Sequence, residues 1–443
     1  MSIIPQETII KKRNGATLSS TEINIFVQGL SNGQVSDPQA AAFAMAILMN
    51  GMSVVERTAL TTAIRDSGKV LSWNLDGPVA DKHSTGGIGD KVSLILGPIA
   101  AACGLFVPMI AGRGLGHTGG TIDKCESIPG YITAPGDDLF EQVVKDCGIA
   151  IIGQTADLAP ADRKLYTLRD VTGTVDSVDL ITSSILANKL AAGSESLVMD
   201  IKVGSGTSMK TTHQAYALAN SIIEVAASAG CKTAAILTRM DQVLGRTAGN
   251  ALEVSEAIAF LKGERQDNML KRVTLTLVGQ MLVNAKLSKN RAHGIVIAAS
   301  KLDDGSAMEI FWKMCASLGA QSGFDKNSDA MMGVGSALII REVPALSSGH
   351  VSSMNARDIG IAVVELGGGR KLPGAAINHR VGVSEPVQVG QAVTTGDPLC
   401  LVHAETEDDF QTAKALIQKA IKIGEQQEQG PLIIDTIDAT GTD

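Results

Sequence analysis

The sequence predicts an α/β protein with a small helical bundle domain, a large α/β domain with a mostly parallel central sheet, and a C-terminal α+β half-barrel subdomain. Three observations indicate this fold. The first part of the chain alternates polar capping residues with apolar runs at helical spacing. The middle part alternates strand-like apolar runs with helical segments, as βαβ units around a buried parallel sheet do. The last part has short strands of alternating polarity between tight turns.

Changes in composition along the chain set the expected domain boundaries. Helical character ends near Gly77, where apolar strands and glycine-rich turns begin. The segment 163–193 contains a helix with few charges, and it is compatible with either the helical domain or the α/β domain. The expected divisions are a helical domain at 1–70 completed by about 163–193, an α/β domain at 71–162 and 194–335, and a C-terminal subdomain at 336–443.

Three helices are expected in the first domain. Ser19, Ser36 and Ser53 each precede an apolar run and supply the side-chain oxygen that an N-cap uses. The second and third helices close at Gly51 and Gly68, because glycine tolerates the left-handed conformation that often ends a helix. Short polar turns between them predict a small bundle.

The middle of the chain supplies the strands of the central sheet and the helices that cover it. The expected strands are PVADKH (78–83), LFVPMIAG (105–112), SLVMDIKVGSG (196–206) and TAAILTRM (233–240). The expected helices include KVSLILGPIAAACG (91–104) and segments near 211–229 and 251–263.

The C-terminal part is expected to form a half-barrel similar to lipoyl and biotinyl carrier domains. Its short strands lie in GIAVVELGGGRKLPG (360–374) and VGVSEPVQVGQAVTTGDPLCLVHA (381–404). Such carriers need a lysine at the hairpin tip, whereas this chain has Val393-Thr394-Thr395-Gly396 there. We therefore expect this subdomain to be structural.

Composition excludes several classes of partner. The 443 residues carry a net charge of −8 and only 3% aromatic side chains, which disfavours a nucleic-acid partner. The six cysteines form no C-x-x-C pair, so a zinc site or a disulfide framework is not indicated. No signal-peptide pattern and no uninterrupted apolar run of membrane-spanning length occurs. We expect a cytoplasmic protein without a membrane partner.

Two similar glycine-rich segments, KHSTGGIGD (82–90) and GHTGGTID (116–123), predict an anion site. Each has a histidine, a small hydroxyl residue, two glycines and an acid, and each is expected to follow a strand and precede a helix. Backbone N–H groups in a glycine turn bind anions well, and glycine lets the backbone approach the oxygens closely. Charge and hydroxyl donors come from Lys82, Ser84, Ser93 and Thr121.

Other polar side chains suit the handling of a leaving group or a base. His83 directly adjoins the anion turn, and an imidazole there can donate to a leaving group. His117 has a similar position in the second segment. Arg169 offers a planar set of donors. Ser184 and Asn188 are four residues apart, on one face of an expected helix, where a plain polar stripe is the alternative interpretation.

Several motifs together resemble the thymidine and pyrimidine-nucleoside phosphorylases. They are DKHSTGGIGDK, GRGLGHTGGTIDKCES, GQTADLAPADRKLYTLRDVTGTVDS, VMDIKVGSG, QVLGRTAGNALEV and the GGGR at 367–370. The resemblance implies the reaction of a pyrimidine nucleoside with inorganic phosphate to give a free base and a pentose 1-phosphate. It implies no required cofactor, and small molecules as the only substrates. It also implies a helical domain across a cleft from an α/β domain, with homodimers formed through the helical domain.

The resemblance also assigns roles to residues of this chain. Phosphate is expected at Lys82, Ser84, Ser93 and Thr121, and His83 is expected to donate toward the base as negative charge builds there. Arg169 and Ser184 are expected to hydrogen-bond the base, while Leu115, Tyr166 and Asn188 complete the substrate site. Some members hold a potassium ion, at positions that match Gly89, Lys91, Leu244, Thr247 and Glu256. Because Lys91 brings its own charge, this chain fits that ion poorly.

Four positions depart from the family pattern. Ala111 stands where a serine is usual, and Asn188 stands where a lysine usually reaches the base. Gly173 replaces a common alanine, and Ser208 replaces a residue that is often bulky. Lys189, about 100° further round the helix, does not replace the missing lysine. Three of these departures concern the base pocket and predict an altered base preference. An ordinary thymidine phosphorylase that tolerates Asn188 is the alternative.

Two other functions remain open on sequence alone. The same type of fold serves anthranilate phosphoribosyltransferase-like enzymes, which carry a related glycine-rich loop and use a phosphoribosyl pyrophosphate with magnesium. Magnesium dependence would separate that reading from a phosphorylase. A third possible function is that of a nucleoside or phosphate binder with weakened catalysis. The joint presence of Lys82, His83, Arg169 and Ser184 argues against it.

Overall fold

The computed structural model describes residues 4–114, 116–155, 157–372 and 374–438. Its N-terminal part is a bundle in which Ser19 and Ser53 form capping boxes with Glu22 and Glu56, and Ser36 precedes the third helix. These are the expected helix starts, and one further helix precedes them. The four helices are α1 (Pro5–Arg13), α2 (Ser20–Asn32), α3 (Asp37–Asn50) and α4 (Val54–Arg65).

The central sheet is mostly parallel, as the sequence predicts. Its strands run in the order β1, β4, β5, β13, and a parallel β2–β3 pair continues the sheet beyond β1 through one bridge between Val79 and Phe106. Only β13 is antiparallel to its neighbour. The strands are β1 (Ala80–Ser84), β2 (Val107–Ala111), β3 (Ile149–Gly153), β4 (Ser196–Val203), β5 (Lys232–Arg239) and β13 (Ile433–Asp438).

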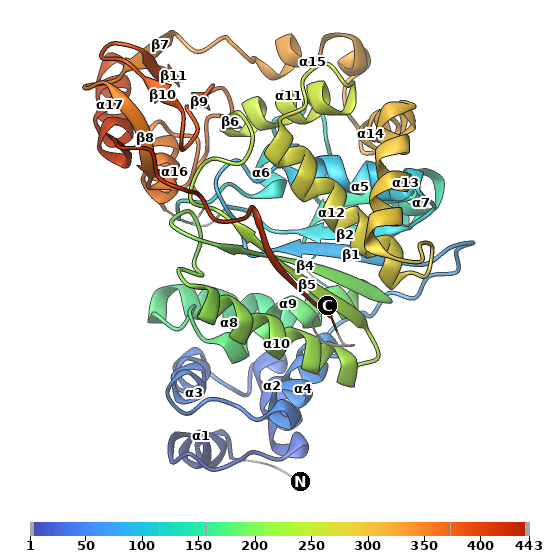
Figure 1. Ribbon diagram of the computed structural model, residues 1–443. Coiled ribbons are helices and arrows are strands. Elements are labelled where there is room, and N and C mark those ends of the chain that lie inside the picture. Colours follow the sequence, from blue (N-terminus) through green and yellow to red (C-terminus); the bar gives the residue numbers. More distant parts are fainter. Residues whose placement is uncertain (1–3, 115, 156, 373, 439–443) are drawn as a thin grey trace.

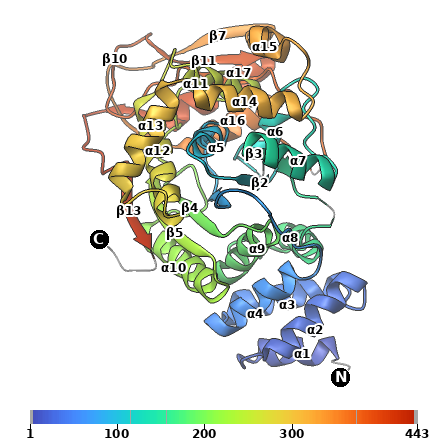
Figure 2. The same ribbon diagram turned by 90° about the vertical axis from the view of Figure 1, so that its right-hand side faces the viewer.

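Helices cover both faces of this sheet (Figure 2). On one face α10 (Thr212–Ser228) packs against β4 and β5. On the other face α5 (Val92–Ala102) and α12 (Asn268–Asn284) pack against the strands and each other. The outer helices are α6 (Thr121–Cys125), α7 (Asp137–Cys147), α11 (Asn250–Leu261), α13 (Arg291–Asp303), α14 (Ser306–Ser317) and α15 (Phe324–Met332).

Helices α8 (Pro160–Thr172) and α9 (Val178–Ala191) lie between the bundle and the sheet (Figure 1). Helix α8 packs against α2 and α3, and α9 packs against α4. Asp179 joins α9 to the bundle by accepting from the Met52 amide at 3.0 Å and from Arg57 at 3.3 Å. The segment near 163–193 therefore contacts the bundle on one side and the sheet domain on the other.

The C-terminal part contains two antiparallel sheets, with strand orders β10-β8-β12 and β6-β9-β11-β7. Its helices are α16 (Ala356–Glu365) and α17 (Glu407–Ala420). The strands are β6 (Thr247–Ala248), β7 (Ile339–Pro344), β8 (Gly349–Met354), β9 (Gly382–Ser384), β10 (Ala392–Val393), β11 (Pro398–Ala404) and β12 (Ile421–Gly424). Strand β6 enters from the α/β domain, and β13, inside the expected 336–443 subdomain, leaves it to join the central sheet.

One expected strand is a helix. Residues 360–365, predicted to be extended, form the second half of α16. The helix buries Ala356, Ile359, Gly360 and Ala362, which share one face at helical spacing. The apolar run IAVV alone could not distinguish the two periods, and the polar start of the helix at Ala356 lay outside the segment that was considered.

Within the described ranges, no helix combines the length and the apolar character needed to cross a bilayer.

Candidate active site at the carboxyl ends of the strands

Lys82 lies on strand β1, in a buried position near the carboxyl end of that strand. The side chain is almost fully buried, yet among the described residues its Nζ has only long contacts, 3.5 Å to Ser93 Oγ and 4.0 Å to Asp200 Oδ2. Burial lowers the pKa of Lys82, and the charges of Asp90 and Asp200 partly oppose this. An ammonium group with this little compensation favours an added anion.

Neighbouring buried lysines are paired more closely than Lys82. Lys202 Nζ lies 2.6 Å from Asp200 Oδ2, and Lys124 Nζ lies 2.8 Å from Glu253 Oε2. Lys82 is thus the lysine of this cluster whose charge is least neutralised by a direct partner.

The turn after β1 is organised by Asp90. Ser84 Oγ donates to Asp90 Oδ2 at 2.6 Å and accepts from the Gly86 amide at 3.1 Å. Burial alone would raise the pKa of Asp90, but the charges of Lys202, Lys82 and Lys124 outweigh burial and hold this pKa below its ordinary value. The other carboxylate oxygen, Oδ1, is buried and has no hydrogen-bond partner within the part of the chain that the structure describes.

The second glycine-rich loop lies against the first. An added Cβ on Gly86, which has φ +85°, would lie 3.7 Å from Thr118. A Cβ on Gly120 would fall 2.1 Å from the Gly114 amide nitrogen, so only glycine allows this close return of the loop. Thr121 follows as the first residue of α6.

Asp123 holds the second glycine-rich loop in place through hydrogen bonds. Its Oδ2 accepts from the Gly114 amide at 2.7 Å, while its Oδ1 accepts from Arg370 at 2.7 Å and from Arg113 at 3.3 Å. Arg370 belongs to the C-terminal part, so a residue far along the chain holds an anion-loop carboxylate. Sequence reasoning quoted the GGGR segment but did not find this contact.

His83 is half-buried beside the same turn. Burial lowers its pKa well below the ordinary histidine value, and the charges of Lys189 and Lys82 lower it further, with Asp90 opposing. The imidazole is therefore neutral at pH 7 and keeps one N–H donor. The backbone of His117 packs against α16, where its carbonyl would lie 2.3 Å from a Cβ on Gly360, and its ring Nε2 is buried with no hydrogen-bond partner among the described residues.

Arg169 holds the connection between α8 and α9. Its guanidinium donates to the carbonyls of Thr174, Leu180 and Val175 at 3.3, 3.2 and 2.8 Å. Burial lowers its pKa, and the charge of Asp162 opposes this most. Two of the five N–H donors remain for another partner.

A polar cluster that sequence reasoning missed surrounds Asn188. Its amide Nδ2 donates to Asp162 Oδ2 at 2.7 Å and to the Ser184 carbonyl at 2.9 Å, and its Oδ1 accepts from Gln154 Nε2 at 2.9 Å. Burial raises the pKa of Asp162, although hydrogen bonds from Ser184 and Asn188 and the charge of Arg169 oppose this. Gln154 directly follows β3, so the cluster lies next to the carboxyl end of that strand.

Lys189 faces away from this cluster, as its helical position predicts. Its buried Nζ donates to Asp81 Oδ2 at 2.7 Å and to the Ile110 carbonyl at 2.9 Å. It thereby ties α9 to β1 and β2, and it does not supply the cation that Asn188 lacks.

Comparison with known proteins assigns all three parts of the chain. Residues 76–308 match the glycosyl transferase family a/b domain, residues 6–68 match the helical bundle domain of that family, and residues 350–424 match the pyrimidine nucleoside phosphorylase C-terminal domain. The first match alone covers more than half of the chain. The chain belongs to this glycosyl transferase family. Its C-terminal domain groups it with the pyrimidine nucleoside phosphorylases of the family.

The family fold is also seen in a solved structure. Anthranilate phosphoribosyltransferase from Thermus thermophilus superposes with a TM-score of 0.59 at 20% identity, over 70% of this chain and 99% of that chain. At this identity the likeness shows the fold alone.

The remaining expected substrate residues of this glycosyl transferase family member lie at several places. Tyr166 is 37% exposed on α8, and Ala111 ends β2. Ser208 is exposed in the loop between β4 and α10. Gly173 ends α8 with φ +66°, and a Cβ there would meet no atom within 4 Å, so this glycine suits the helix end rather than relieving a crowded pocket. Leu115 lies outside the described residues.

The positions expected to hold potassium in some family members surround a lysine instead. Lys91 Nζ lies 2.9 Å from the Leu244 carbonyl, 3.2 Å from the Thr247 carbonyl and 2.9 Å from Glu256 Oε2. A potassium ion therefore does not fit these residues, because an ammonium group already occupies the space between the expected ligands. Gly89 packs closely against the Leu244 and Thr247 carbonyls, where a Cβ would lie 2.6 and 2.8 Å from their oxygens.

Proposed function

We propose that this protein catalyses reversible phosphorolysis of a pyrimidine nucleoside or deoxynucleoside, such as thymidine, deoxyuridine or uridine. The products are the free base and ribose or deoxyribose 1-phosphate. The observation that carries the proposal is the buried, weakly partnered Lys82 ammonium of β1, close to Ser93 and Asp200 and to the charge of Asp90 in the glycine-rich turn that follows the strand. Membership of the family provides independent support.

In this proposal a phosphate oxygen forms the bond to C1′ as the C1′–N bond to the base breaks and its electron pair passes to the base. Lys82, with the hydroxyls of Ser93 and Thr121, holds the phosphate, and Ser84 joins them when its hydroxyl proton turns from Asp90 to the phosphate. Neutral His83 donates a hydrogen bond to the base as negative charge develops on it. This division of roles needs positioning and electrostatic stabilisation, with no covalent enzyme intermediate. Inorganic phosphate is a co-substrate and no cofactor is required.

Arg169 and Ser184 are proposed to hold the base. Arg169 keeps two N–H donors beyond its three carbonyl contacts, and Ser184 shares a helix face with Asn188. Three acceptor contacts already fix the guanidinium in place, so little conformational entropy is lost when a base binds.

The base preference is proposed to differ from that of a typical thymidine phosphorylase. Asn188 contributes no charge, and its amide is already bonded to Asp162, Ser184 and Gln154. The buried Asp162 carboxylate therefore receives a hydrogen bond from a neutral amide at position 188. A lysine at 188 would instead place a positively charged ammonium group beside it. A base that relies on a cationic donor for its developing charge is therefore bound less well in the transition state.

The test incubates the purified protein with inorganic phosphate and a set of nucleosides, without added metal, and measures free base by chromatography. The set contains thymidine, deoxyuridine, uridine, cytidine and modified or purine nucleosides. Phosphate-dependent release of a pyrimidine is expected, and Lys82→Gln is expected to abolish it. Turnover that requires a phosphoribosyl pyrophosphate and magnesium would replace the proposal with a phosphoribosyltransferase, and binding without turnover would indicate a weakened binder.

Asn188→Lys tests the base preference within the same assay. Restoring a charged donor is expected to raise kcat/KM for thymidine by about 10-fold to about 100-fold, the effect of one hydrogen bond to a charged group. Lys189 is left unchanged, since it is committed to Asp81. Efficient thymidine turnover by the natural sequence, with no gain in the variant, would show that Asn188 is merely tolerated.

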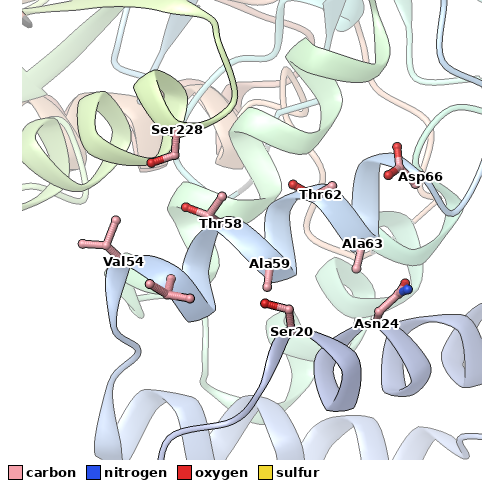
Figure 3. Close-up of a pocket in the computed structure, with 10 residues that line it drawn as sticks. Ser20, Asn24, Val54, Thr58, Ala59, Thr62, Ala63, Asp66 and Ser228 are labelled. Atoms are coloured by element: carbon pink, nitrogen blue, oxygen red, sulfur yellow. The ribbon is translucent and has the colours of Figure 1, made fainter. Parts of the chain in front are cut away.

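We also propose that the protein is a cytoplasmic homodimer formed through the helical domain. Large apolar side chains are exposed there: Met45 and Met49 on α3 are 39% and 74% exposed, and Val55 on α4 is 67% exposed. A groove of about 520 Å³ runs between α2 and α4 beside Val55 (Figure 3). No nucleic-acid or membrane partner is proposed.

A further inference from the structure

Lys91 is held in a closed cage of oxygen atoms. The side chain has no exposed surface, and its Nζ contacts the Leu244 carbonyl, the Thr247 carbonyl and Glu256 Oε2 at 2.9, 3.2 and 2.9 Å. An ammonium group has three N–H donors. The three oxygens therefore satisfy the group completely and leave it no free donor.

Two glycines in left-handed conformations close this cage. A Cβ on Gly89, at φ +73°, would lie 2.6 Å from the Leu244 carbonyl and 2.8 Å from the Thr247 carbonyl. A Cβ on Gly245, at φ +80°, would lie 2.4 Å from Glu256 Oε1 and 2.9 Å from Lys91 Nζ. Any larger residue would open the cage, so the backbone is shaped around this one positive group.

The charge of the cage is balanced by a single cation. Glu256 Oε2 also accepts from Thr247 Oγ1 at 2.6 Å, and Oε1 accepts from the Arg246 amide at 2.8 Å. Its lone pairs are used by these donors and by Lys91. A second cation beside Lys91 would meet like charge in a buried place without another carboxylate to offset it.

The cage joins the phosphate turn to the C-terminal part. Lys91 directly precedes α5, which carries Ser93, and Leu244 donates its amide to the Ile88 carbonyl at 3.0 Å. Thr247 begins β6, which pairs with β9 of the C-terminal part. A cation at this point therefore holds together the turn that carries the proposed phosphate ligands and the segment that enters the neighbouring sheet.

We propose that the Lys91 ammonium is a built-in monovalent cation that takes the place of an exchangeable potassium ion. The protein is consequently independent of potassium, and removal of the lysine side chain creates a potassium site from the oxygens left behind. The stability part of this inference does not depend on the proposed activity, so failure of one is distinguishable from failure of the other.

The first test measures the Tm of the natural protein in KCl, NaCl and choline chloride at equal ionic strength. We expect the three values to agree within about 1 °C, because no site for a small cation is open. A Tm in KCl clearly above that in both other salts would overturn the proposal, since it would show that potassium binds beside Lys91.

The second test uses Lys91→Thr, with Lys91→Ser in parallel because its smaller side chain leaves more room. Each shortens the side chain, places a hydroxyl at the former Cγ position and leaves the space of Cδ, Cε and Nζ open to an ion. We expect a lowered Tm in choline chloride and a recovery in KCl of at least about 3 °C relative to choline. If the variants fold only in KCl, that result also supports the proposal.

The matched control is Lys12→Thr, which removes another buried lysine paired with a glutamate. Lys12 Nζ lies 2.8 Å from Glu56 Oε1 in the helical bundle, and it bonds no carbonyl oxygen of the described residues. Its loss of stability is expected to be the same in all three salts. Adding Glu256→Gln to Lys91→Thr is expected to remove the potassium effect. Equal recovery in KCl and choline, or failure of both Lys91 variants to fold in any salt, would overturn the proposal.

Discussion

His83 behaves differently from an ordinary surface histidine because its surroundings disfavour the protonated form. Burial is the main cause of its low pKa, and Lys189 and Lys82 add to it. A neutral donor beside the base can stabilise negative charge by hydrogen bonding without first having to be protonated from solution. Binding of a phosphate anion near Lys82 would offset part of the lysine effect and raise this pKa.

A comparison with His83→Gln tests the low pKa of the free protein. Because the folded-state pKa lies below the unfolded value, the unfolded chain binds the proton first as pH falls below about 6.5. The natural protein should therefore lose stability relative to His83→Gln below that pH, by at most about 1.4 kcal/mol per pH unit. Urea unfolding of both proteins between pH 5 and 7.5 measures this, and parallel curves would contradict it.

At the scale of residues, local pattern predicted donors and missed their buried partners. The glycine-rich turns predicted roles for Lys82 and Ser84, because backbone chemistry restricts what such turns do, and these roles stay predictions. Asp162 and Gln154 were missed because their proximity to Asn188 exists only after β3, α8 and α9 have packed. The helical period did predict correctly that Lys189 points elsewhere.

At the scale of elements, the second glycine-rich loop depends on a segment far from it in the sequence. Arg370 is 16% exposed and bonds the same Asp123 oxygen that the exposed Arg113 reaches. Asp123 in turn holds the Gly114 amide. The C-terminal part thus acts on the loop through one carboxylate.

Arg370→Gln is expected to loosen this loop and raise the KM for phosphate by about 3-fold to about 10-fold, with a smaller change in kcat. Arg113→Gln is the control, because its side chain is 51% exposed and surface ion pairs contribute little. Steady-state kinetics with phosphate varied gives both values, and Arg370→Lys should recover part of the loss. An equal effect of both glutamine variants would argue against a special role for Arg370.

Several elements followed from local signals, and the one that was assigned to the wrong class has a clear physical cause. Serines directly before apolar runs located α2 and α4, and the structure adds a glutamate to each cap. Helix α16 was mistaken for a strand because four consecutive apolar residues fit either period, and its packing against the rest of the C-terminal part decides between them.

At the scale of the whole molecule, β13 shows why domain boundaries along the chain are not boundaries in space. It follows the C-terminal sheets in sequence yet pairs with β5, so the central sheet combines strands from the middle of the chain with one from the C-terminal end of the described residues. No composition change marks this return. The strand IIDTID mixes isoleucines with polar residues, because it is mostly half-buried where it joins the sheet. The mostly parallel sheet itself was predictable from the repeated strand and helix alternation.

The homodimer prediction also belongs to the whole molecule. Replacing Met49 and Val55 with glutamate places two charges on the exposed apolar surface of α3 and α4 and should convert a dimer into a monomer. Light scattering coupled to size exclusion measures the mass, and Leu338→Glu and Leu372→Glu are controls at exposed apolar residues elsewhere. A dimer that survives the first pair of changes would place the interface on another surface.

The ion pair between Lys189 and Asp81 limits how α9 can move relative to the sheet. Both groups are buried, and separating them would leave two charges without partners, at a cost of about 3–5 kcal/mol. Lys189 also donates a hydrogen bond to the Ile110 carbonyl near the end of β2. An opening and closing motion of the helical part that keeps this ion pair would turn about a point near it, so residues at the far end of α9 would travel furthest while Asn188 would stay almost in place.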